Sequence, residues 1–561
     1  MLVVTCVAVL LVAPSLANDP SIDDSLHRIM VGAGGSRTLP GPVTGLFSFV
    51  DGDVGRNRRL IQSGLLPWWA HPSLKVAFFR PLAAALHVID HSLWPTLPAL
   101  MQLHNMIWFA GTILVVGLFY RRLGSTAWIA GCATALYALD EAHGWAVGWV
   151  ANRAALMATF FGVAALLCHD AWRRRGRLLG AFGAPILLAI GLLCGEMATG
   201  AVGYFVAYAV FRERGSLLRR ASSLAPAAVV CGIWFATCRL LGFGVAHSGA
   251  YLDPLASPAG FILELPVRAL IALLGQLTPV PAEASSLVPP FHTTHVVVAV
   301  ILVPLLALAF FRLLRGNREA GFWATGMLLA LAPICAGTPH NRNLWYVGLG
   351  AMGLVACYLS VVRASAVGRG SAMVAGFLVL FHFFLSPLAL PVMARVPGLV
   401  GRMITRASET LPDAAFEDGR TLVIASTPNA YIFAINAVLR RFERDGRLPR
   451  RVRVLSSSGR PATLTRVDER TVEVAREDVL LPGTIDRLFR AEEVRTGATV
   501  VLDDVRITIL RTGKDGRGCR VSFRFARNLD DASLVWVKWS GRRYRELAPP
   551  PVGQTTTLEA D

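Results

Sequence analysis

The sequence predicts a mostly α-helical membrane protein that crosses the bilayer many times and ends in a small β-rich (α+β) domain. Three observations predict this fold class. Long apolar segments recur through the first 390 of the 561 residues. Charged residues make up only 16% of the chain, whereas soluble domains carry about 25%. From about residue 415, short alternating segments typical of strands replace the apolar ones.

About eleven apolar segments are predicted to be spans, because a helix needs about 20 apolar residues to cross the hydrocarbon core. They lie near 2–17, 97–119, 126–139, 154–169, 178–195, 197–211, 222–241, 295–314, 319–337, 343–361 and 371–388. A further apolar segment, 260–278, contains Glu264, Pro266 and Arg268. We interpret it as an interfacial or re-entrant helix, with a transmembrane helix as the alternative. The expected organisation is a transmembrane module over 1–390, a linker over 391–414 and a soluble domain over 415–561.

Basic loops fall at every second junction between the predicted spans. They are Arg121–Arg122, Arg173–Arg177, Arg212–Arg220, Arg312–Arg318 and Arg363–Arg369. The positive-inside rule places such loops in the cytoplasm. The N-terminus is then cytoplasmic and the C-terminal domain extracytoplasmic, in a plasma membrane such as the bacterial inner membrane. This topology accounts for the net charge of +18 without nucleic acid as a partner.

The first segment leaves a second interpretation open. Ser15-Leu16-Ala17 loosely resembles a signal-peptide cleavage site, but no basic residue precedes it. In both interpretations residue 18 onward emerges on the outer face.

The first outer loop, 18–96, is the longest polar stretch in the membrane half and opens with the adjacent carboxylates of Asp23 and Asp24. One carboxylate can act as a general base toward an acceptor hydroxyl. Low dielectric and a like-charged neighbour raise one pKa toward neutrality. The alternative is that one of the pair caps a following helix. Further along, Trp68 and Trp69 suit the headgroup region of a bilayer.

The second outer loop combines acidic, titratable and cationic side chains. Asp140 and Glu141 are acidic, His143 can titrate, and Arg153 can bind a phosphate with two parallel hydrogen bonds. The structural alternative is an interfacial helix anchored by tryptophans.

Two further turns on the same side carry candidates. Glu196 lies between two spans with almost no loop, and a carboxylate at that depth indicates a functional site. Its structural alternative is an ion pair with an arginine such as Arg153 or Arg342. His340 and Arg342 occupy another outer turn, which puts a cation where an anionic headgroup lies.

The nine cysteines form no CxxC pair, so neither a disulfide framework nor a thiolate metal site is expected. No metal site is predicted, although a divalent cation is compatible with the acidic groups. The domain after residue 415 is expected to hold strands near 421–425, 452–455, 471–474, 499–502, 505–510, 520–525 and 533–538, with a helix over 430–442. Its arginines either form a solvated basic surface or bind acidic glycans or lipid headgroups.

The order of these features resembles a known family. The residues that carry the resemblance are the acidic pair after the first span, Phe79-Arg80-Pro81-Leu82, His104-Asn105, Tyr137 to His143, and Trp149 to Leu156. This pattern, over roughly 1–360, resembles the GT-C type of membrane glycosyltransferases, in the branch of protein O-mannosyltransferase-like proteins. The chain departs from it at Asp140-Glu141-Ala142-His143, where members often have His-Pro, and at the basic run 56–59.

The resemblance implies inverting transfer of a sugar from a polyprenyl-phosphate donor to a protein, lipid or glycan acceptor on the outer face of the bilayer. It implies that Asp23 or Asp24 is the catalytic base and that Asn341-Arg342 contacts the phosphate of the carrier. The residues expected around the substrate and the lipid phosphate are Arg80, Asp140, Glu141, His143, Arg153, Glu196, His340 and Arg342.

Two other functions fit the charge placement. A transporter or flippase of lipid-linked substrates would carry ionisable residues at mid-bilayer and repeated halves. A non-catalytic assembly protein would present the outer domain. The discriminating condition is geometric: a glycosyltransferase needs Asp23 or Asp24 within one substrate's reach of Arg153, Glu196 or Arg342, below an apolar groove.

Overall fold

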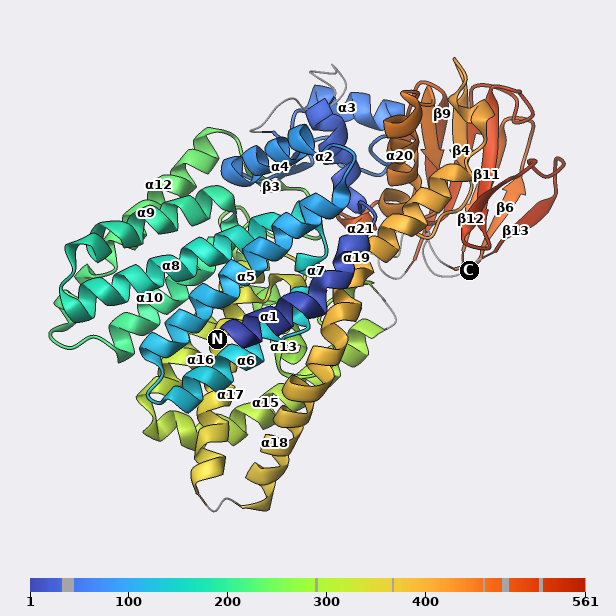
Figure 1. Cartoon of the computed structure of the whole chain (residues 1–561). Coiled ribbons are helices and arrows are strands. Elements are labelled where there is room, and N and C mark those ends of the chain that lie inside the picture. The colour runs from blue at the N-terminus through green and yellow to red at the C-terminus, as the bar shows by residue number, and fades with distance from the viewer. Residues whose placement is uncertain are drawn as a thin grey trace.

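The computed structural model describes residues 1–32, 45–287, 291–365, 368–457, 460–476, 484–513 and 518–559. Figure 1 shows a bundle of helices on one side and the strands of the C-terminal domain on the other, with α2, α3 and α20 between them. The predicted fold class, a helical membrane module followed by a β-rich domain, is confirmed.

The helical module contains nineteen α-helices in the described residues, α1 to α19. They are α1 (Leu2–Val12), α2 (Ile22–Gly32), α3 (Val54–Ser63), α4 (Pro81–Leu93), α5 (Pro98–Leu123), α6 (Ala127–Ala138), α7 (Ala142–Val147), α8 (Arg153–Arg175), α9 (Leu178–Cys194), α10 (Gly200–Phe211), α11 (Leu217–Ser222), α12 (Ala225–Leu240), α13 (Pro258–Leu277), α14 (Ala284–Leu287), α15 (His292–Gly316), α16 (Arg318–Ile334), α17 (Trp345–Ala364), α18 (Arg369–Val379) and α19 (Ser386–Glu409). Short 3₁₀ turns join some of them, namely η1 (Ala13–Ala17), η2 (Val150–Asn152), η3 (Glu196–Thr199) and η5 (Asn341–Asn343).

Every segment predicted as a span is helical, but the helices differ in length. Among the described residues, six helical stretches are long and apolar enough to cross a membrane, or up to seven if the stretches Leu2–Ala17 and Ile22–Gly32, bent by 68°, form one span. Four predicted spans form shorter apolar helices, and 319–337 forms the 17-residue α16. The segment 260–278 forms α13, which has the length and hydropathy of a span. Both of its flanks nevertheless contact the outer turn after α16, because the amide of Leu252 donates to the carbonyl of Ala336 and the amide of Ala282 donates to Asn341 Oδ1. These contacts favour the interfacial or re-entrant interpretation of this segment.

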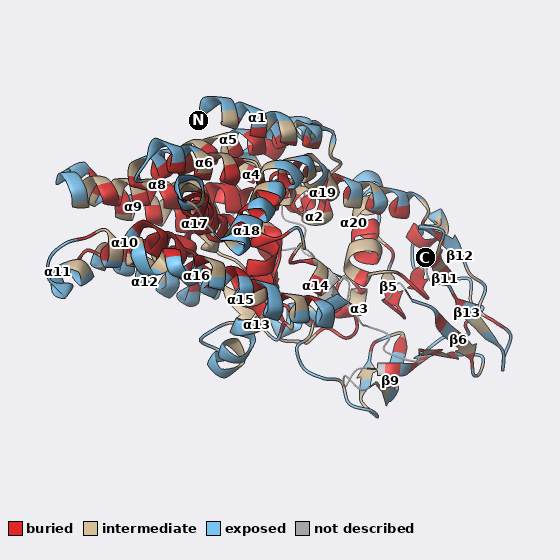
Figure 2. Cartoon of the chain, turned by 90° about the horizontal axis from the view of Figure 1, so that it is seen from below, coloured by how far each residue is buried: buried red, intermediate tan, exposed pale blue. Residues whose placement is uncertain are grey.

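Exposed apolar side chains cover the outside of this bundle. On α15 they include Val300, Ile301, Leu305 and Leu308, each more than half exposed. Figure 2 shows buried residues through the centre of the bundle, whereas α11 and α12 carry mostly exposed and intermediate ones. A water-exposed surface of this kind is unfavourable, and contact with lipid removes the cost.

The basic loops meet at one end of the bundle. The contacts that join them are Arg122 with Asp170, Arg174 with the carbonyl of Arg122, Arg212 with the carbonyl of Leu123, the amide of Ser125 with Glu319, and Arg363 with the ring of Trp128. The helix α8 ends at this basic end, and Arg153 is its first residue, at the opposite end. The helix α16 begins at the basic end, and Arg342 follows its opposite end, in η5. The predicted separation of basic loops from candidate site residues therefore exists in the fold.

The last helix runs further than the sequence indicates. α18, a π-helical turn (η6, Leu380–Leu385) and α19 together form a 41-residue helical stretch, Arg369–Glu409. Most of the segment expected as a linker, 391–414, is thus the end of α19. Close packing against α7 supports it, because a Cβ on Gly148 would lie 2.0 Å from the carbonyl oxygen of Ala394. Arg395 also donates to the carbonyl of Pro14 and to Asn18 Oδ1, at 3.0 and 2.9 Å.

The C-terminal domain contains two sheets. One has the order β12-β11-β4-β5 and the other β13-β6-β7-β10-β9-β8. The strands are β4 (Thr421–Ile424), β5 (Arg451–Val454), β6 (Ala462–Arg466), β7 (Thr471–Ala475), β8 (Thr499–Val501), β9 (Val505–Thr512), β10 (Gly518–Phe525), β11 (Leu534–Ser540), β12 (Arg543–Glu546) and β13 (Thr555–Leu558). The sequence prediction misses β6, β12 and β13. The chain between the parallel strands β4 and β5 forms a π-helical turn, η8 (Ala430–Ile435), followed by α20 (Asn436–Asp445). A further short helix, α21 (Thr484–Arg487), follows β7.

The first outer loop packs into this domain rather than onto the bilayer surface. Its strands β1 (Ser48–Asp51) and β2 (Lys75–Ala77) form a small sheet with β3 (Gly244–Ala246). The indole of Trp68 donates to the carbonyl of Val454 at 2.9 Å, and that of Trp69 to the carbonyl of Asp486 at 3.3 Å. Both rings are buried in one hydrophobic core with the C-terminal strands. The interpretation of these two tryptophans as headgroup anchors is wrong.

Candidate active site

A cavity of about 340 Å³ lies where the helical module, the first outer loop and the C-terminal domain meet. Its walls are mostly apolar, with contributions from α2, the β1–β2 loop region, α7, η5 and η8. The ionisable side chains on these walls are Asp23, Tyr251, His340, Arg342 and Tyr431. An apolar pocket with a few convergent polar groups is the usual form of a small-molecule site.

Asp23 lies in the first turn of α2, beyond the bend that ends the first predicted span. Its Oδ1 accepts a hydrogen bond from the Tyr431 hydroxyl at 2.9 Å. Burial raises the pKa of this carboxyl group above its usual range, and the Tyr431 hydrogen bond and the charges of Arg342 and Arg80 oppose the rise. Asp23 is therefore a carboxylate held in an apolar cavity with a pKa shifted toward neutrality.

Arg342 provides a cation on the same cavity. It lies in η5, with its guanidinium carbon 4.8 Å from the centre of the Trp149 ring. In the described part of the chain, no carboxylate lies within ion-pair distance of this guanidinium and no hydrogen bond to it is found. A half-buried arginine without a paired anion is unfavourable, so the position favours an anionic ligand.

Arg80 and Glu196 form a bidentate ion pair beside this region. The Nε of Arg80 donates to Glu196 Oε2 at 2.9 Å, and Nη2 donates to Oε1. The guanidinium also lies against the rings of Phe47 and Phe78, at 5.0 and 4.6 Å from their centres. The partner of Glu196 is thus Arg80, and the alternatives with Arg153 or Arg342 are wrong.

His340 lines the cavity as a neutral group. Its Nδ1 accepts from the backbone amide of Arg342 at 3.2 Å, which closes the η5 turn. Burial and the charge of Arg342 lower the pKa of His340 well below its usual range. The ring lies edge-on to Trp145, 4.9 Å between centres. His340 therefore positions Arg342 and contributes no positive charge at neutral pH.

Asp24 faces away from the cavity and holds backbone groups. Its two carboxylate oxygens accept from the amide of Ser21 at 2.7 Å and from the amide of Ala151 at 2.8 Å. The first bond begins α2, and the second joins α2 to η2. Asp24 is the third residue of α2 and accepts from the amide of the residue before the helix, as in a capping box. The capping alternative that the sequence left open for one of the two aspartates therefore applies to Asp24.

The structure does not bring Asp140, Glu141 and His143 of the second outer loop to the cavity, which this loop reaches through Trp145 and Trp149. Asp140 accepts from the amide of Ala142 at 3.0 Å and from Gln276 at 2.7 Å, and Glu141 bonds to the Ser386 hydroxyl. His143 stacks on Trp345 with ring centres 4.1 Å apart. These three side chains are buried where α7 packs against its neighbours.

Arg153 is also committed to the interior. It forms an ion pair with Asp90, and it donates to Asn105 Oδ1 at 2.6 Å and to the carbonyl of Met101 at 2.9 Å. The side chain is fully buried. These contacts join α8 to α4 and α5, so a phosphate cannot bind the Arg153 guanidinium without breaking them.

Tyr251 and Tyr431 belong to the site and carry no sequence signal. Tyr251 follows β3, and Tyr431 is in η8 of the C-terminal domain. Burial raises the pKa of Tyr431 well above its usual range, so it remains a donor to Asp23 at physiological pH. Tyrosines of this kind are found only when the fold brings distant segments together.

No family model and no curated protein matches the chain. A solved structure of the oligosaccharyltransferase from Archaeoglobus fulgidus, tethered with an acceptor peptide containing the NVT sequon, is similar to it at 15% identity and a TM-score of 0.38. The alignment covers 81% of this chain and 64% of the archaeal one. This similarity is too low to assign a function.

Proposed function

We propose that this chain is a membrane glycosyltransferase that moves a sugar from a polyprenyl-phosphate donor to an acceptor on the outer face of a bacterial inner membrane. One observation carries the proposal: Asp23 and Arg342, which has no ion-pair partner among the described residues, line the same apolar cavity. A base for the acceptor and a cation for the leaving phosphate are the two groups that this transfer requires. The resemblance of residues 1–360 to GT-C enzymes of the O-mannosyltransferase-like branch supports the same reaction.

In this mechanism the donor's phosphate binds at Arg342 and its lipid tail leaves along apolar walls. The acceptor's hydroxyl attacks the anomeric carbon while Asp23 accepts the hydroxyl proton. The bond between the anomeric carbon and the phosphate oxygen breaks, and the configuration inverts. The products are the glycosylated acceptor and the polyprenyl phosphate, whose growing negative charge Arg342 stabilises.

The environment of Asp23 suits a general base. One oxygen, Oδ1, is held by Tyr431, and among the described residues Oδ2 has no hydrogen-bond partner, which leaves it to receive the proton. A base works best when its pKa is near the operating pH, and burial moves the pKa of Asp23 in that direction. Arg80 is bound to Glu196 and adds positive potential without direct contact to the phosphate.

The test compares the two adjacent aspartates in a deletion strain complemented with variants. Asp23→Asn is expected to reduce transfer by about 10²- to 10⁴-fold, the usual contribution of a positioned base, while the protein accumulates normally in the membrane. Asp24→Asn is the matched control and is expected to lower the amount of folded protein rather than the rate per molecule. Mass spectrometry of the envelope glycans gives the readout. Restoration of the glycan by Asp23→Asn would remove Asp23 from the mechanism.

A further inference from the structure

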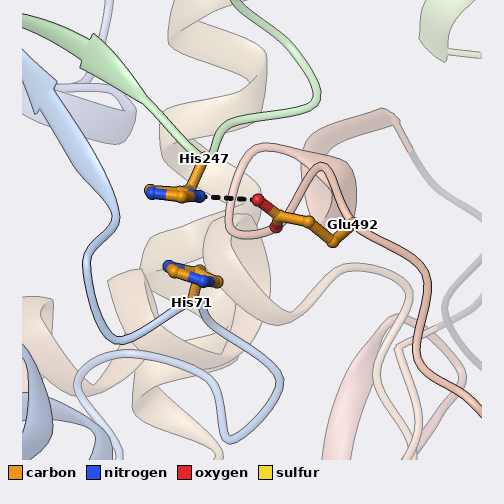
Figure 3. Close-up of side chains that lie close together, drawn as sticks. All are labelled: His71, His247 and Glu492. Carbon is orange, nitrogen blue, oxygen red and sulfur yellow. Dashed lines mark hydrogen bonds and ion pairs between the residues drawn. The ribbon is translucent and has the colours of Figure 1, made fainter.

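Three ligand-type side chains from distant segments meet outside the cavity. They are His71 in the first outer loop, His247 after β3, and Glu492 in the C-terminal domain (Figure 3). One ligand atom from each lies within 4.8 Å of the other two. Nothing in their sequence spacing predicts such a group.

The backbone holds the three residues in place. The amide of His71 donates to the carbonyl of Phe489 at 2.9 Å, and the amide of Ala491 donates to the carbonyl of His247 at 3.0 Å. A third bond, from the amide of Gly249 to the carbonyl of Arg487, measures 2.8 Å. His247 has a positive φ of 58°, a conformation that costs energy in residues other than glycine. The surrounding hydrogen bonds thus fix the directions in which the side chains leave the backbone.

The side chains have the chemistry of a divalent transition-metal site. His247 Nδ1 bonds to Glu492 Oε1 at 2.6 Å, and the rings of His71 and His247 stack with centres 3.8 Å apart. Two imidazole nitrogens and one carboxylate oxygen are a common donor set for zinc, which keeps its remaining positions for water or another ligand. The side chains of His247 and Glu492 are 38% and 45% exposed, so an ion can enter from solvent.

We propose that His71, His247 and Glu492 bind a zinc-class divalent metal ion that joins the first outer loop, the β3 loop and the C-terminal domain. The ion takes the place of the hydrogen-bond proton between His247 Nδ1 and Glu492, and the imidazole proton moves to Nε2. Because lone pairs lie in the ring plane, one of the two stacked rings turns so that both nitrogens reach the same ion. The proposal is independent of glycosyl transfer and concerns how one wall of the cavity is held in place.

The position explains why such an ion would matter. Leu488 and Phe489, on the same short segment as Glu492, line the cavity. The proposed ion therefore sits behind one wall of the cavity and connects it to the loop that carries His71. Metal ligation of three segments stabilises the folded state by the free energy of binding.

The test is a titration of the full-length protein in detergent, stripped by a chelator, with ZnCl₂ alone. Calorimetry is expected to give one bound ion, and zinc is expected to raise the melting temperature. His247→Ala and Glu492→Gln are expected to weaken binding by at least about tenfold and to abolish the rise in melting temperature. His292→Ala, an exposed histidine elsewhere, and Glu493→Gln, the adjacent carboxylate, are the matched controls and should bind like the wild type.

Two outcomes overturn the proposal. One is the absence of saturable zinc binding by the wild type. The other is wild-type affinity in the variants, which would mean an adventitious ion only. Because Glu492 is exposed, Glu492→Gln is expected to fold, and its melting temperature without zinc checks this directly.

Discussion

At the scale of single residues, the direction of the side chain distinguishes the proposed catalytic aspartate from its structural neighbour. Asp23 and Asp24 are neighbours in sequence, yet one faces the cavity and the other accepts two backbone amides. Successive residues on a helix point about 100° apart, so the two carboxylates of α2 leave the helix in different directions. The proposed base is therefore a single carboxylate, with Tyr431 as its only described hydrogen-bond donor.

Arg342→Gln is expected to weaken binding of a polyprenyl phosphate by about 10- to 100-fold, since hydrogen bonds to charged groups contribute about 1.5–3 kcal/mol. Arg342→Lys keeps the charge but loses the paired guanidinium donors, so its affinity for the polyprenyl phosphate should fall between those of the wild type and Arg342→Gln. Arg369→Gln, exposed at the basic end of the bundle, is the control. Native mass spectrometry with a short-chain polyprenyl phosphate measures the affinities. Unchanged binding by Arg342→Gln would contradict a phosphate site at this residue.

Tyr431→Phe is expected to shift the pH dependence of transfer. The reaction needs ionised Asp23, so activity is present above the pKa of Asp23 and lost as pH falls through it. The Tyr431 hydrogen bond lowers this pKa, and its removal raises the pKa further. The acidic limb of the pH–rate profile should therefore move to higher pH, with the plateau rate largely kept. Tyr544→Phe removes a buried hydroxyl bonded to Thr427 and should leave the limb in place, and a limb that moves to lower pH in Tyr431→Phe would refute the assignment.

At the scale of elements, α19 is the helix against which α7, with its candidate residues, packs. It packs along α7 and the first span, and it continues to the C-terminal domain. The close approach of α7 to α19 depends on glycine, because no room exists for a side chain at Gly148. Burial of Asp140, Glu141 and His143 follows from this packing, which is why these polar residues have structural partners.

Gly148→Ala is expected to destabilise the protein by about 1–3 kcal/mol, the usual cost of overpacking. The added Cβ would lie 2.0 Å from the carbonyl oxygen of Ala394. Gly131→Ala, in α6 with nothing within 4 Å of the added carbon, is the control and should leave the melting temperature unchanged or raise it, because alanine favours helix. Thermal unfolding in detergent measures both. Equal melting temperatures for Gly148→Ala and the wild type would show that α7 and α19 are not packed this closely.

At the scale of the whole molecule, the cavity exists only because two modules meet. The first outer loop is buried in the core of the C-terminal domain through Trp68 and Trp69. The same contact brings Tyr431 within 2.9 Å of Asp23, across 408 residues of sequence. The proposed metal ion lies at another part of this junction.

Hydropathy and loop charge predict much of this architecture. Apolar length predicts the helices, and arginine spacing predicts which loops share an end, because both are local properties of the chain. The acidic pair and Arg342 are also predicted from sequence. The choice of Asp23 over Asp24, the pairing of Glu196 with Arg80 and the interior role of Arg153 could not be predicted, since each depends on helix phase or on a partner far along the chain. Tyr251, Tyr431 and the His71–His247–Glu492 group have no local signal at all.

The central claim is that one cavity holds the phosphate of a lipid donor at Arg342 and the acceptor's proton at Asp23. The most direct measurement is a cryo-electron microscopy structure of the Asp23→Asn variant with a polyprenyl-phosphate sugar. The expected result is a phosphate within hydrogen-bond distance of the Arg342 guanidinium, with the sugar between it and residue 23. A phosphate bound at another site, with the cavity closed to the lipid, would contradict the claim.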